Sequence, residues 1–293
     1  LPIVPRPIVR RVSRRYIAGD TLDEAVRTVA GLNGEGLMAT LDVLGESVTE
    51  RSLVEAAVRD YAAAIDAIRS GRLDANISIK PTQFGLSLDF DLCLDRVRTL
   101  AQRALDAGNF VRIDMEDSRC TSATLDLYRR LRAEGFTNVG VVLQAYMRRS
   151  LADVRALPEG ANVRLCKGIY IEPPGVAYQD RGVVNKNFVR LLEELFDRGA
   201  YVGIATHDED LVFEAERLLE RRRLPGTAYE FQMLLGVAEP LRRIVRGAGH
   251  RLRVYVPYGP QWYAYSLRRL KENPRIAGYI LSSLLAGGAS RRA

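Results

Sequence analysis

The residues best suited to chemistry gather near the end of the chain, in the stretch VYVPYGPQWYAYSLRRLKENP (254–274). It holds two adjacent guanidinium groups, at Arg268 and Arg269, and the only tryptophan of the protein, Trp262. A guanidinium binds a carboxylate through planar, charge-assisted hydrogen bonds. In a helix, Tyr265 would share a face with Arg268, three residues later. The stretch therefore predicts a helix that holds a small carboxylate against an aromatic wall; the alternative is a surface arginine pair beside a core aromatic stripe.

Polar side chains also stand at the ends of most apolar runs. In parallel α/β enzymes the catalytic side chains lie where strands run into the following loops, so this repetition predicts an active site. Some polar residues are expected wherever a strand reaches the surface, and the recurrence at nearly every run carries the prediction. These residues are Lys80, Asp114 with Glu116 and Asp117, Gln144, Arg164 with Lys167, Thr206 with His207, Glu230 with Gln232, and Tyr255 with Tyr258.

The elements that must position these residues alternate regularly. Short runs rich in β-branched residues are each followed by a helical pattern. Such alternation implies parallel strands with right-handed crossovers, and eight units in about 250 residues fit a (β/α)8 barrel of the α/β class. Strands are expected at 37–45, 76–80, 110–115, 138–146, 161–168, 201–208, 228–234 and 251–259, and helices near 50–71, 89–107, 121–135, from 150, and near 184–199, 209–223, 237–248 and 261–273.

Three details complete the expected organisation. Thr121 or Ser122 is expected to cap the helix after the third strand, and Gly135 to end it. A doubly wound nucleotide-binding sheet is the second choice, because GLNGEG (31–36) lacks the GxGxxG spacing and precedes a strand. We expect one domain, with an N-terminal arm or helix over 1–33, the barrel over 34–274, and a C-terminal helix and tail over 275–293.

Composition excludes several classes of protein. The chain is 47% hydrophobic and 27% charged, which is typical of a globular protein. Its cysteines, Cys93, Cys120 and Cys166, are far apart and it has two histidines, so neither a disulfide framework nor a metal site is predicted. The net charge is +7, but acidic residues are interspersed, so nucleic-acid binding is not expected. No apolar run reaches the ~18–20 residues of a membrane span, and we expect a cytoplasmic protein with at most peripheral contact with the inner face of the membrane.

Seven motifs, in order along the chain, resemble those of the proline dehydrogenase family. The resemblance implies a distorted barrel, a non-covalently held FAD, and oxidation of L-proline to Δ1-pyrroline-5-carboxylate by hydride transfer to flavin N5, the first step of proline catabolism to glutamate. It also implies a quinone electron acceptor and transient contact with pyrroline-5-carboxylate dehydrogenase. The motifs are SIKPTQFG (78–85), VRIDMED (111–117), VVLQAYMRRS (141–150), VRLCKGIYIEP (163–173), ATHD (205–208), YEFQML (229–234) and the stretch 254–274 quoted above.

The resemblance also implies roles for single residues. Asp114 and Arg164 would be catalytic, and Arg164 would lie near flavin N5. The substrate would contact Lys80, Tyr255, Tyr265, Arg268 and Arg269. The cofactor would contact Met115, Gln144, Arg164, Lys167, Gly168, Ile169, Thr206 and His207. Two positions depart from the family pattern. The family often has KGAY where this chain has KGIY, so Ile169 replaces an alanine, and Leu235 replaces a tyrosine.

The residues themselves leave some roles open. Clustered cations at Lys80, Arg268 and Arg269 would lower the pKa of a bound amine by like-charge repulsion. Asp114 is expected to order Lys80 through an ion pair or to receive a proton, with a structural pairing to Arg112 as the alternative. His207 is interpreted either as a cofactor contact or as a structural hydrogen-bonding residue.

Two other functions compete with the flavoenzyme. A lysine at a strand end, Lys80 or Lys167, could serve as the Schiff-base nucleophile of an aldolase-type barrel. Alternatively, the arginine-rich surface could belong to a basic binding module for an anionic membrane or nucleic acid.

Overall fold

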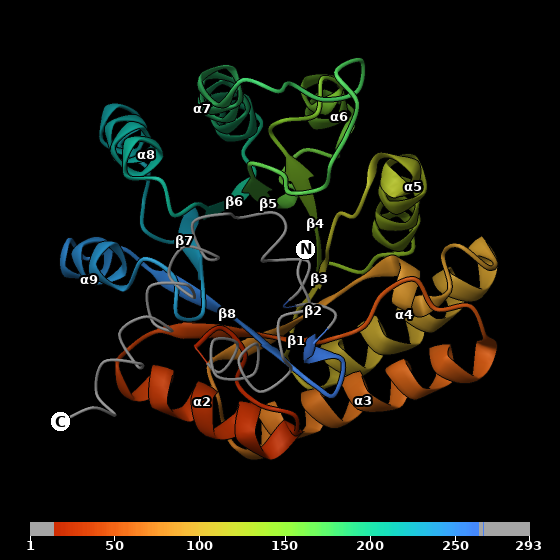
Figure 1. Ribbon diagram of the computed structural model, residues 1–293. Coiled ribbons are helices and arrows are strands. Elements are labelled where there is room, and N and C mark those ends of the chain that lie inside the picture. The colour runs from red at the N-terminus through yellow and green to blue at the C-terminus, as the bar shows by residue number, and fades with distance from the viewer. Residues whose placement is uncertain (1–14, 264–265, 267–293) are drawn as a thin grey trace, which may run out of the picture.

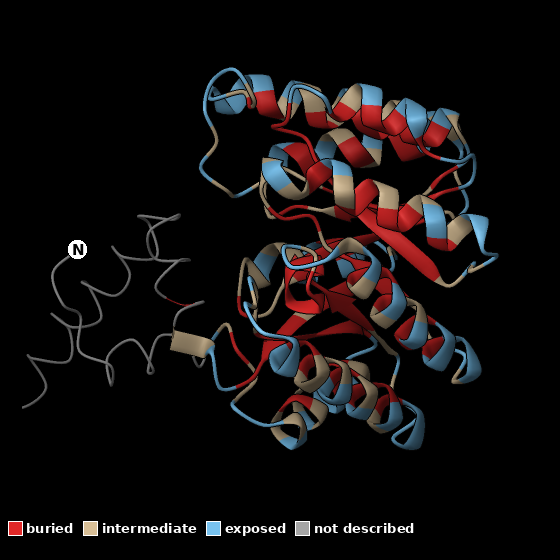
Figure 2. Ribbon diagram, turned by 90° about the vertical axis from the view of Figure 1, so that its right-hand side faces the viewer, coloured by how far each residue is buried: buried red, intermediate tan, exposed pale blue. Residues whose placement is uncertain are grey.

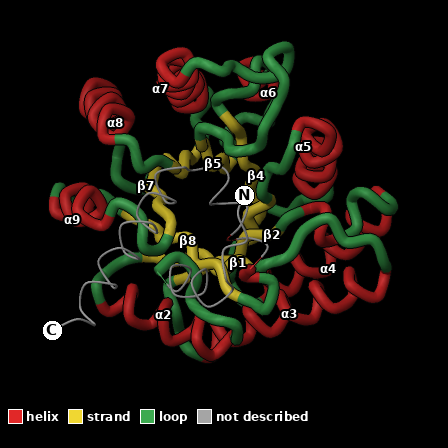
Figure 3. Tube along the Cα trace, in the orientation of Figure 1, coloured by secondary structure: helices red, strands yellow, loops and turns green. Residues whose placement is uncertain are grey.

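The computed structural model describes residues 15–263 and residue 266. Its strands follow one another in chain order, all parallel, and the last pairs with the first, so the sheet is a closed barrel (Figures 1 and 3). The (β/α)8 barrel predicted from the alternation is confirmed. The strands are Met38–Val43 (β1), Ala75–Ile79 (β2), Val111–Ile113 (β3), Val139–Gln144 (β4), Asn162–Cys166 (β5), Tyr201–Ala205 (β6), Tyr229–Leu234 (β7) and Leu252–Tyr258 (β8).

Helices form a ring outside the barrel, as Figure 3 shows. The α-helices that follow the strands lie close to the ranges expected from their periodic apolar residues, because one apolar face must pack on the sheet. The helices of the described residues are Leu22–Gly34 (α2), Arg51–Ser70 (α3), the 3₁₀ helix Pro81–Phe84 (η1), Phe90–Asp106 (α4), Ser118–Ala133 (α5), Ser150–Ala156 (α6), Arg181–Asp197 (α7), Glu209–Arg222 (α8) and Glu239–Gly247 (α9).

The start of α5 differs from the expectation. Its N-cap is Asp117, whose side chain accepts a hydrogen bond from the backbone N–H of Arg119 at 3.1 Å. Thr121 and Ser122 lie inside the helix, so the cap predicted there is wrong. A carboxylate at a helix N-terminus satisfies an unpaired N–H and also interacts favourably with the helix dipole. Gly135, with φ 96°, follows the last residues of the helix as predicted.

The ring departs from a regular barrel at α2. This helix packs against both β1 and β8, the place that the helix after the eighth strand takes in a regular barrel. Before α2, the chain runs beside the carboxyl end of β8, where Ala18 N–H donates to Pro257 O at 2.9 Å and Gly259 N–H donates to Gly19 O at 3.0 Å. The predicted N-terminal helix therefore completes the ring.

The segment after β8 becomes helical at Trp262, which packs against Ile17 and Leu44. Most of the helix predicted at 261–273, and all of the one at 275–293, lie outside the described residues, as do residues 1–14. Within the described ranges, we find no helix that is both long and apolar enough to cross a membrane.

Two kinds of side chain alternate along the strands. Apolar strand residues such as Leu41, Ile77 and Val163 share one buried core with helix residues such as Ile65, and burial follows the surfaces where helices meet the sheet (Figure 2). Successive strand side chains point to opposite faces. The intervening positions therefore face the barrel interior, and many of them are polar yet buried: Thr40, Asp42, Ser78, Arg112, Arg164, Glu230, Gln232 and Arg253.

Candidate active site

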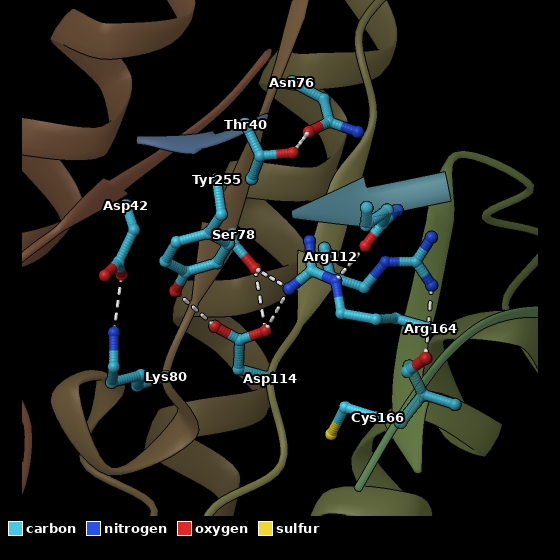
Figure 4. Close-up of polar contacts among 12 residues, drawn as sticks. Thr40, Asp42, Asn76, Ser78, Lys80, Arg112, Asp114, Arg164, Cys166 and Tyr255 are labelled. Carbon is cyan, nitrogen blue, oxygen red and sulfur yellow. Dashed lines mark hydrogen bonds and ion pairs between the residues drawn. The ribbon is translucent and has the colours of Figure 1, made fainter. Parts of the chain in front are cut away.

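Asp114 lies at the centre of a polar cluster at the carboxyl end of the barrel (Figure 4). Its Oδ1 accepts hydrogen bonds from Ser78 Oγ at 2.8 Å and from Arg164 Nη1 at 2.7 Å. Its Oδ2 accepts a hydrogen bond from Tyr255 Oη at 2.8 Å. Side chains from β2, β5 and β8 thus converge on one carboxylate that directly follows β3. The structure brings together Asp114, Arg164 and Tyr255, as the sequence predicted for strand ends in a barrel.

The Arg164 guanidinium is held on several sides. It is 6% exposed, and its Cζ lies 5.2 Å from the centre of the Tyr255 ring, which is a cation–π contact. Its Nε donates to Gln232 Oε1 at 2.5 Å, while Nη1 donates to Asp114 and to Ser78 Oγ. The orientation of the guanidinium plane is therefore fixed by partners on three other strands.

Lys80 directly follows β2 and forms its ion pair with Asp42 of β1, at 2.5 Å between Nζ and Oδ1. Asp42 is fully buried, and Tyr61 Oη donates to the same oxygen at 3.3 Å and to Ser78 O at 2.7 Å. The expected pairing of Lys80 with Asp114 is wrong. Asp42 lies on the strand adjacent to Lys80, whereas Asp114 accepts hydrogen bonds from Ser78, Arg164 and Tyr255.

Arg112, the alternative partner considered for Asp114, is also bound elsewhere. Its Nη1 donates to Val141 O at 3.1 Å and to Asn162 O at 2.9 Å. Burial, with the nearby charge of Arg164, lowers the pKa of Arg112 below its usual value. Arg112 therefore stabilises the barrel interior rather than the mouth.

Gln144, at the end of β4, belongs to a second group of contacts. Its Nε2 donates to Glu116 O at 2.8 Å, while its buried Oε1 has no hydrogen-bond partner within the described ranges. The Glu116 carboxylate accepts from Thr82 N–H at 2.9 Å and from Thr82 Oγ1 at 2.5 Å. Burial raises the pKa of Glu116 despite these two hydrogen bonds. This group ties the loop after β2 to the ends of β3 and β4 and leaves one acceptor for a ligand N–H.

The loop after β5 holds three of the predicted cofactor residues. Lys167 Nζ forms an ion pair with Asp208, the N-cap of α8. Gly168 has φ 106°, and a Cβ there would overlap the ring of Tyr146. Only glycine adopts this backbone without strain, so the chain passes Tyr146 closely. Ile169 is 37% exposed.

The remaining described candidates are structural contacts as well as strand-end residues. His207 Nε2 accepts a hydrogen bond from Leu234 N–H at 2.8 Å, which joins the ends of β6 and β7. An accepting Nε2 requires a neutral ring with its proton on Nδ1. Thr206 Oγ1 accepts from Asp208 N–H at 3.1 Å, and Met115 is buried in the apolar core.

The predicted carboxylate clamp lies outside the described residues. Tyr265, Arg268 and Arg269 all fall there, so their roles stay predictions. Conversely, sequence reasoning assigned no role to Asp42 or Ser78, and named Gln232 only as a strand-end residue. Their signal was available: polar residues at every second position of a strand, as in Thr40 and Asp42, indicate a polar barrel interior.

Comparison with known sequences identifies relatives of this chain. The family model described as "Proline dehydrogenase" matches residues 25–280. Proline dehydrogenase 1 of Bacillus subtilis (strain 168) is 36% identical over 274 residues, which cover 93% of this chain and 90% of the relative. The proline dehydrogenase of Deinococcus radiodurans is 35% identical over 300 residues, which cover 98% of this chain and 97% of the relative.

Comparison with solved structures gives the same result for the fold. The crystal structure of proline utilization A from Bdellovibrio bacteriovorus, inactivated by N-propargylglycine, superposes with a TM-score of 0.83 at 25% sequence identity. The match covers 90% of this chain but 33% of that one, so this chain corresponds to about a third of the larger protein.

Proposed function

The chain belongs to the proline dehydrogenase family, and from that premise we propose that it oxidises L-proline to Δ1-pyrroline-5-carboxylate with a non-covalently bound FAD. The observation that carries this proposal is the cluster of Asp114, Arg164 and Tyr255 beside the Lys80–Asp42 pair, at the end of the barrel where enzymes of this fold do their chemistry.

The described residues fit a flavin. The buried Oε1 of Gln144, which has no hydrogen-bond partner among the described residues, suits an N–H at the edge of the isoalloxazine ring. Gly168 would contribute backbone contacts, and Arg164 and Lys167 supply the positive charge that an electron-rich reduced ring and a diphosphate require. Met115, Ile169, Thr206 and His207 would complete the contacts. When bound, FAD supplies the two-electron acceptor that takes the hydride at N5.

The substrate would be held by positive charge. Arg268 and Arg269 would bind the carboxylate of proline, with Tyr265 and Tyr255 against its ring. Binding the carboxylate in this way would point the ring carbon next to the nitrogen toward flavin N5, because hydride transfer requires the donor carbon to be held in a fixed position. Lys80 adds a cation that lowers the pKa of the bound amine, which must lose a proton before hydride can leave.

Asp114 acts by holding other groups. It accepts hydrogen bonds from Arg164 and Tyr255 at 2.7 and 2.8 Å, so it fixes the two side chains that would border the reacting atoms. This contact set supports an orienting role for Asp114, which would act on the reaction through Arg164 and Tyr255.

The aldolase alternative is disfavoured by the two lysines on which it depends. A Schiff-base lysine must be neutral to attack a carbonyl. Lys80 and Lys167 instead form ion pairs with Asp42 and Asp208, so each amine is held by a carboxylate rather than placed to attack a carbonyl. The electrons would pass from the flavin to a quinone, and the product to a pyrroline-5-carboxylate dehydrogenase.

A proline-dependent dye-reduction assay on purified protein tests the proposal. The protein should be yellow, with a flavin absorbance band near ~450 nm, and proline should bleach that band because it reduces the cofactor.

Arg268→Lys and Arg269→Lys should retain FAD but lose most affinity for proline, since lysine offers a point charge in place of a fork. A colourless protein that borohydride traps with a carbonyl substrate would favour the aldolase instead, and normal proline saturation in both variants would reject the clamp.

A further inference from the structure

We propose that Gln232 is a positioning residue that fixes the Arg164 guanidinium from beneath, anchored by Glu230 and Arg253 in the barrel interior. This inference rests on the proposed function, because the proposed function places Arg164 beside the flavin. It concerns side chains below the mouth that would touch neither substrate nor cofactor.

The first step is the contact between Gln232 and Arg164. Gln232 is 5% exposed, and its Oε1 accepts from Arg164 Nε at 2.5 Å. Its Nε2 donates to Glu230 Oε1 at 2.6 Å. An amide offers an acceptor at one atom and donors at the other, so the Glu230 carboxylate determines which atom faces Arg164. With the amide reversed, its NH2 group would face the Arg164 Nε donor and its oxygen would face the Glu230 carboxylate, so neither hydrogen bond would form.

The second step is the anchoring of Glu230. Its Oε1 accepts from Arg253 Nε at 2.7 Å, and its Oε2 accepts from Tyr201 Oη at 2.8 Å. Arg253 in turn donates from Nη1 to Ala39 O at 2.7 Å. Burial alone would raise the pKa of Glu230, but the charge and hydrogen bonds of Arg253 outweigh burial and hold the pKa at about 2. Glu230 is therefore an ionised, immobile acceptor at neutral pH.

The third step is the space that lets Gln232 reach Arg164. β6 lies between β5 and β7, and its residue Gly203 is in register with Arg164 on one side and with Glu230 on the other. A Cβ at Gly203 would overlap the amide nitrogen of Gln232. The glycine thus opens a passage across β6, through which the β7 side chain contacts the β5 side chain.

These contacts make a continuous hydrogen-bonded chain from the barrel interior to the mouth: Arg253, Glu230, Gln232, Arg164, Asp114. Without Gln232, the buried Nε of Arg164 would lose the acceptor it has in this structure, and the guanidinium would be held by its Nη1 contacts and the Tyr255 ring. A guanidinium that tilts places its charge less well for the electron-rich reduced flavin. The relay should therefore affect the reduction step more than the binding of proline.

Gln232→Met tests the relay, since it keeps the length of the side chain and removes both hydrogen bonds. Losing a hydrogen bond to a charged group should lower kcat by about 10- to 100-fold. The midpoint potential of the bound flavin should become more negative, because positive charge near the reduced ring is less well placed. FAD content and the KM for proline should stay close to wild type, while the thermal midpoint should fall by a few degrees because two buried hydrogen bonds are lost. Gln102→Met, the same change on the outer surface of α4, serves as the matched control.

Gly203→Ala is the second variant, in case Gln232→Met folds poorly. It adds one methyl group where the Gln232 amide lies, removes no functional group, and should shift kcat and flavin potential in the same direction. In an Arg164→Lys background, which lacks the Nε donor, the Gln232→Met effect on the rate of flavin reduction should shrink to less than about two-fold, because coupled residues are non-additive.

The outcomes separate the two proposals. Wild-type kcat and potential in both Gln232→Met and Gly203→Ala would overturn the relay and leave the proposed function standing. An undiminished Gln232→Met effect in the Arg164→Lys background would also overturn it, since Gln232 would then act through another group. A wild-type protein that holds no flavin or does not oxidise proline would overturn the proposed function, and the relay with it.

Discussion

At the scale of single residues, Asp114 shows how a partly buried carboxylate is made stable and useful. A charge removed from water is costly unless it is paired and hydrogen-bonded. Asp114 has such partners in Arg164, Ser78 and Tyr255, each contributed by a different strand. Because the same three contacts orient Arg164 and Tyr255, the stability of this carboxylate and the geometry of the mouth depend on one set of hydrogen bonds.

Asp114→Asn should separate these roles. An amide keeps the shape but turns one acceptor into a donor, so either Tyr255 or Arg164 loses its acceptor. We expect kcat/KM for proline to fall about 100-fold, the equivalent of about 2–3 kcal/mol for a hydrogen bond to a charged group. FAD content should be retained. Asp95→Asn, the same change at an exposed carboxylate paired with Arg96, is the control and should leave kcat/KM unchanged. Equal kcat/KM values for the two variants would contradict the assignment of Asp114 to the site.

At the scale of elements, the loops after the strands are held by short-range devices in addition to the apolar core. Asp208 caps α8 and at the same time pairs with Lys167 from the loop after β5. Thr82 in η1 binds Glu116, which leads into the Asp117 cap of α5. These two strand-end segments, after β5 and after β3, are therefore fixed to neighbouring helix starts, so the helix caps help to position the mouth.

The Asp117 cap of α5 can be tested directly. Asp117→Ala removes the acceptor for the Arg119 N–H and should lower the free energy of unfolding by about 1 kcal/mol, the usual value of an N-cap. Ser122→Ala removes only an exposed contact with Arg149 and should cost less than about 0.5 kcal/mol. Urea unfolding of both variants measures the difference. A larger loss for Ser122→Ala would restore the cap position that the sequence suggested.

At the scale of the whole molecule, the barrel interior is unusual in its charge. Buried arginines at 112, 164 and 253 point inward together with Glu230, where branched apolar residues dominate many barrels. Glycines at 140 and 203 lie where a Cβ would overlap the side chains of Arg112 and Gln232. A charged interior of this kind links the stability of the fold to the protonation of its carboxylates.

The stability of the fold should therefore depend on Glu230 at acid pH. Its pKa in the folded protein is about 2, below the ordinary 4.5, so the folded state binds this proton less readily than the unfolded chain does. The resulting stabilisation is present above about pH 4.5 and is lost as the pH falls toward 2; the shift corresponds to about 3 kcal/mol. Glu230→Gln lacks this dependence, so the difference in unfolding free energy between wild type and variant should shrink over that range. A constant difference would show that Glu230 is not the group responsible.

Local pattern predicted much of the molecule. The alternation of β-branched runs with amphipathic helices predicted the barrel, because a parallel strand must be buried on both faces and its crossover must cover it. The same pattern predicted that Lys80, Asp114, Arg164 and Tyr255 would meet, since parallel strands bring their carboxyl ends to one rim. The single-domain assignment and the clamp of Arg268 and Arg269 stay predictions.

Pairing inside the barrel was a different matter. Lys80 binds Asp42 rather than Asp114, and Gln232 reaches Arg164 across Gly203. These partners are 38 and 68 positions apart, and their choice depends on strand register and on the room that each neighbour leaves. Sequence alone thus determined which residues face the interior, through the two-residue period of a strand. Only the tertiary structure decided which of them bind one another, because hydrogen bonds and ion pairs need contact at about 3 Å, a distance that no local period specifies.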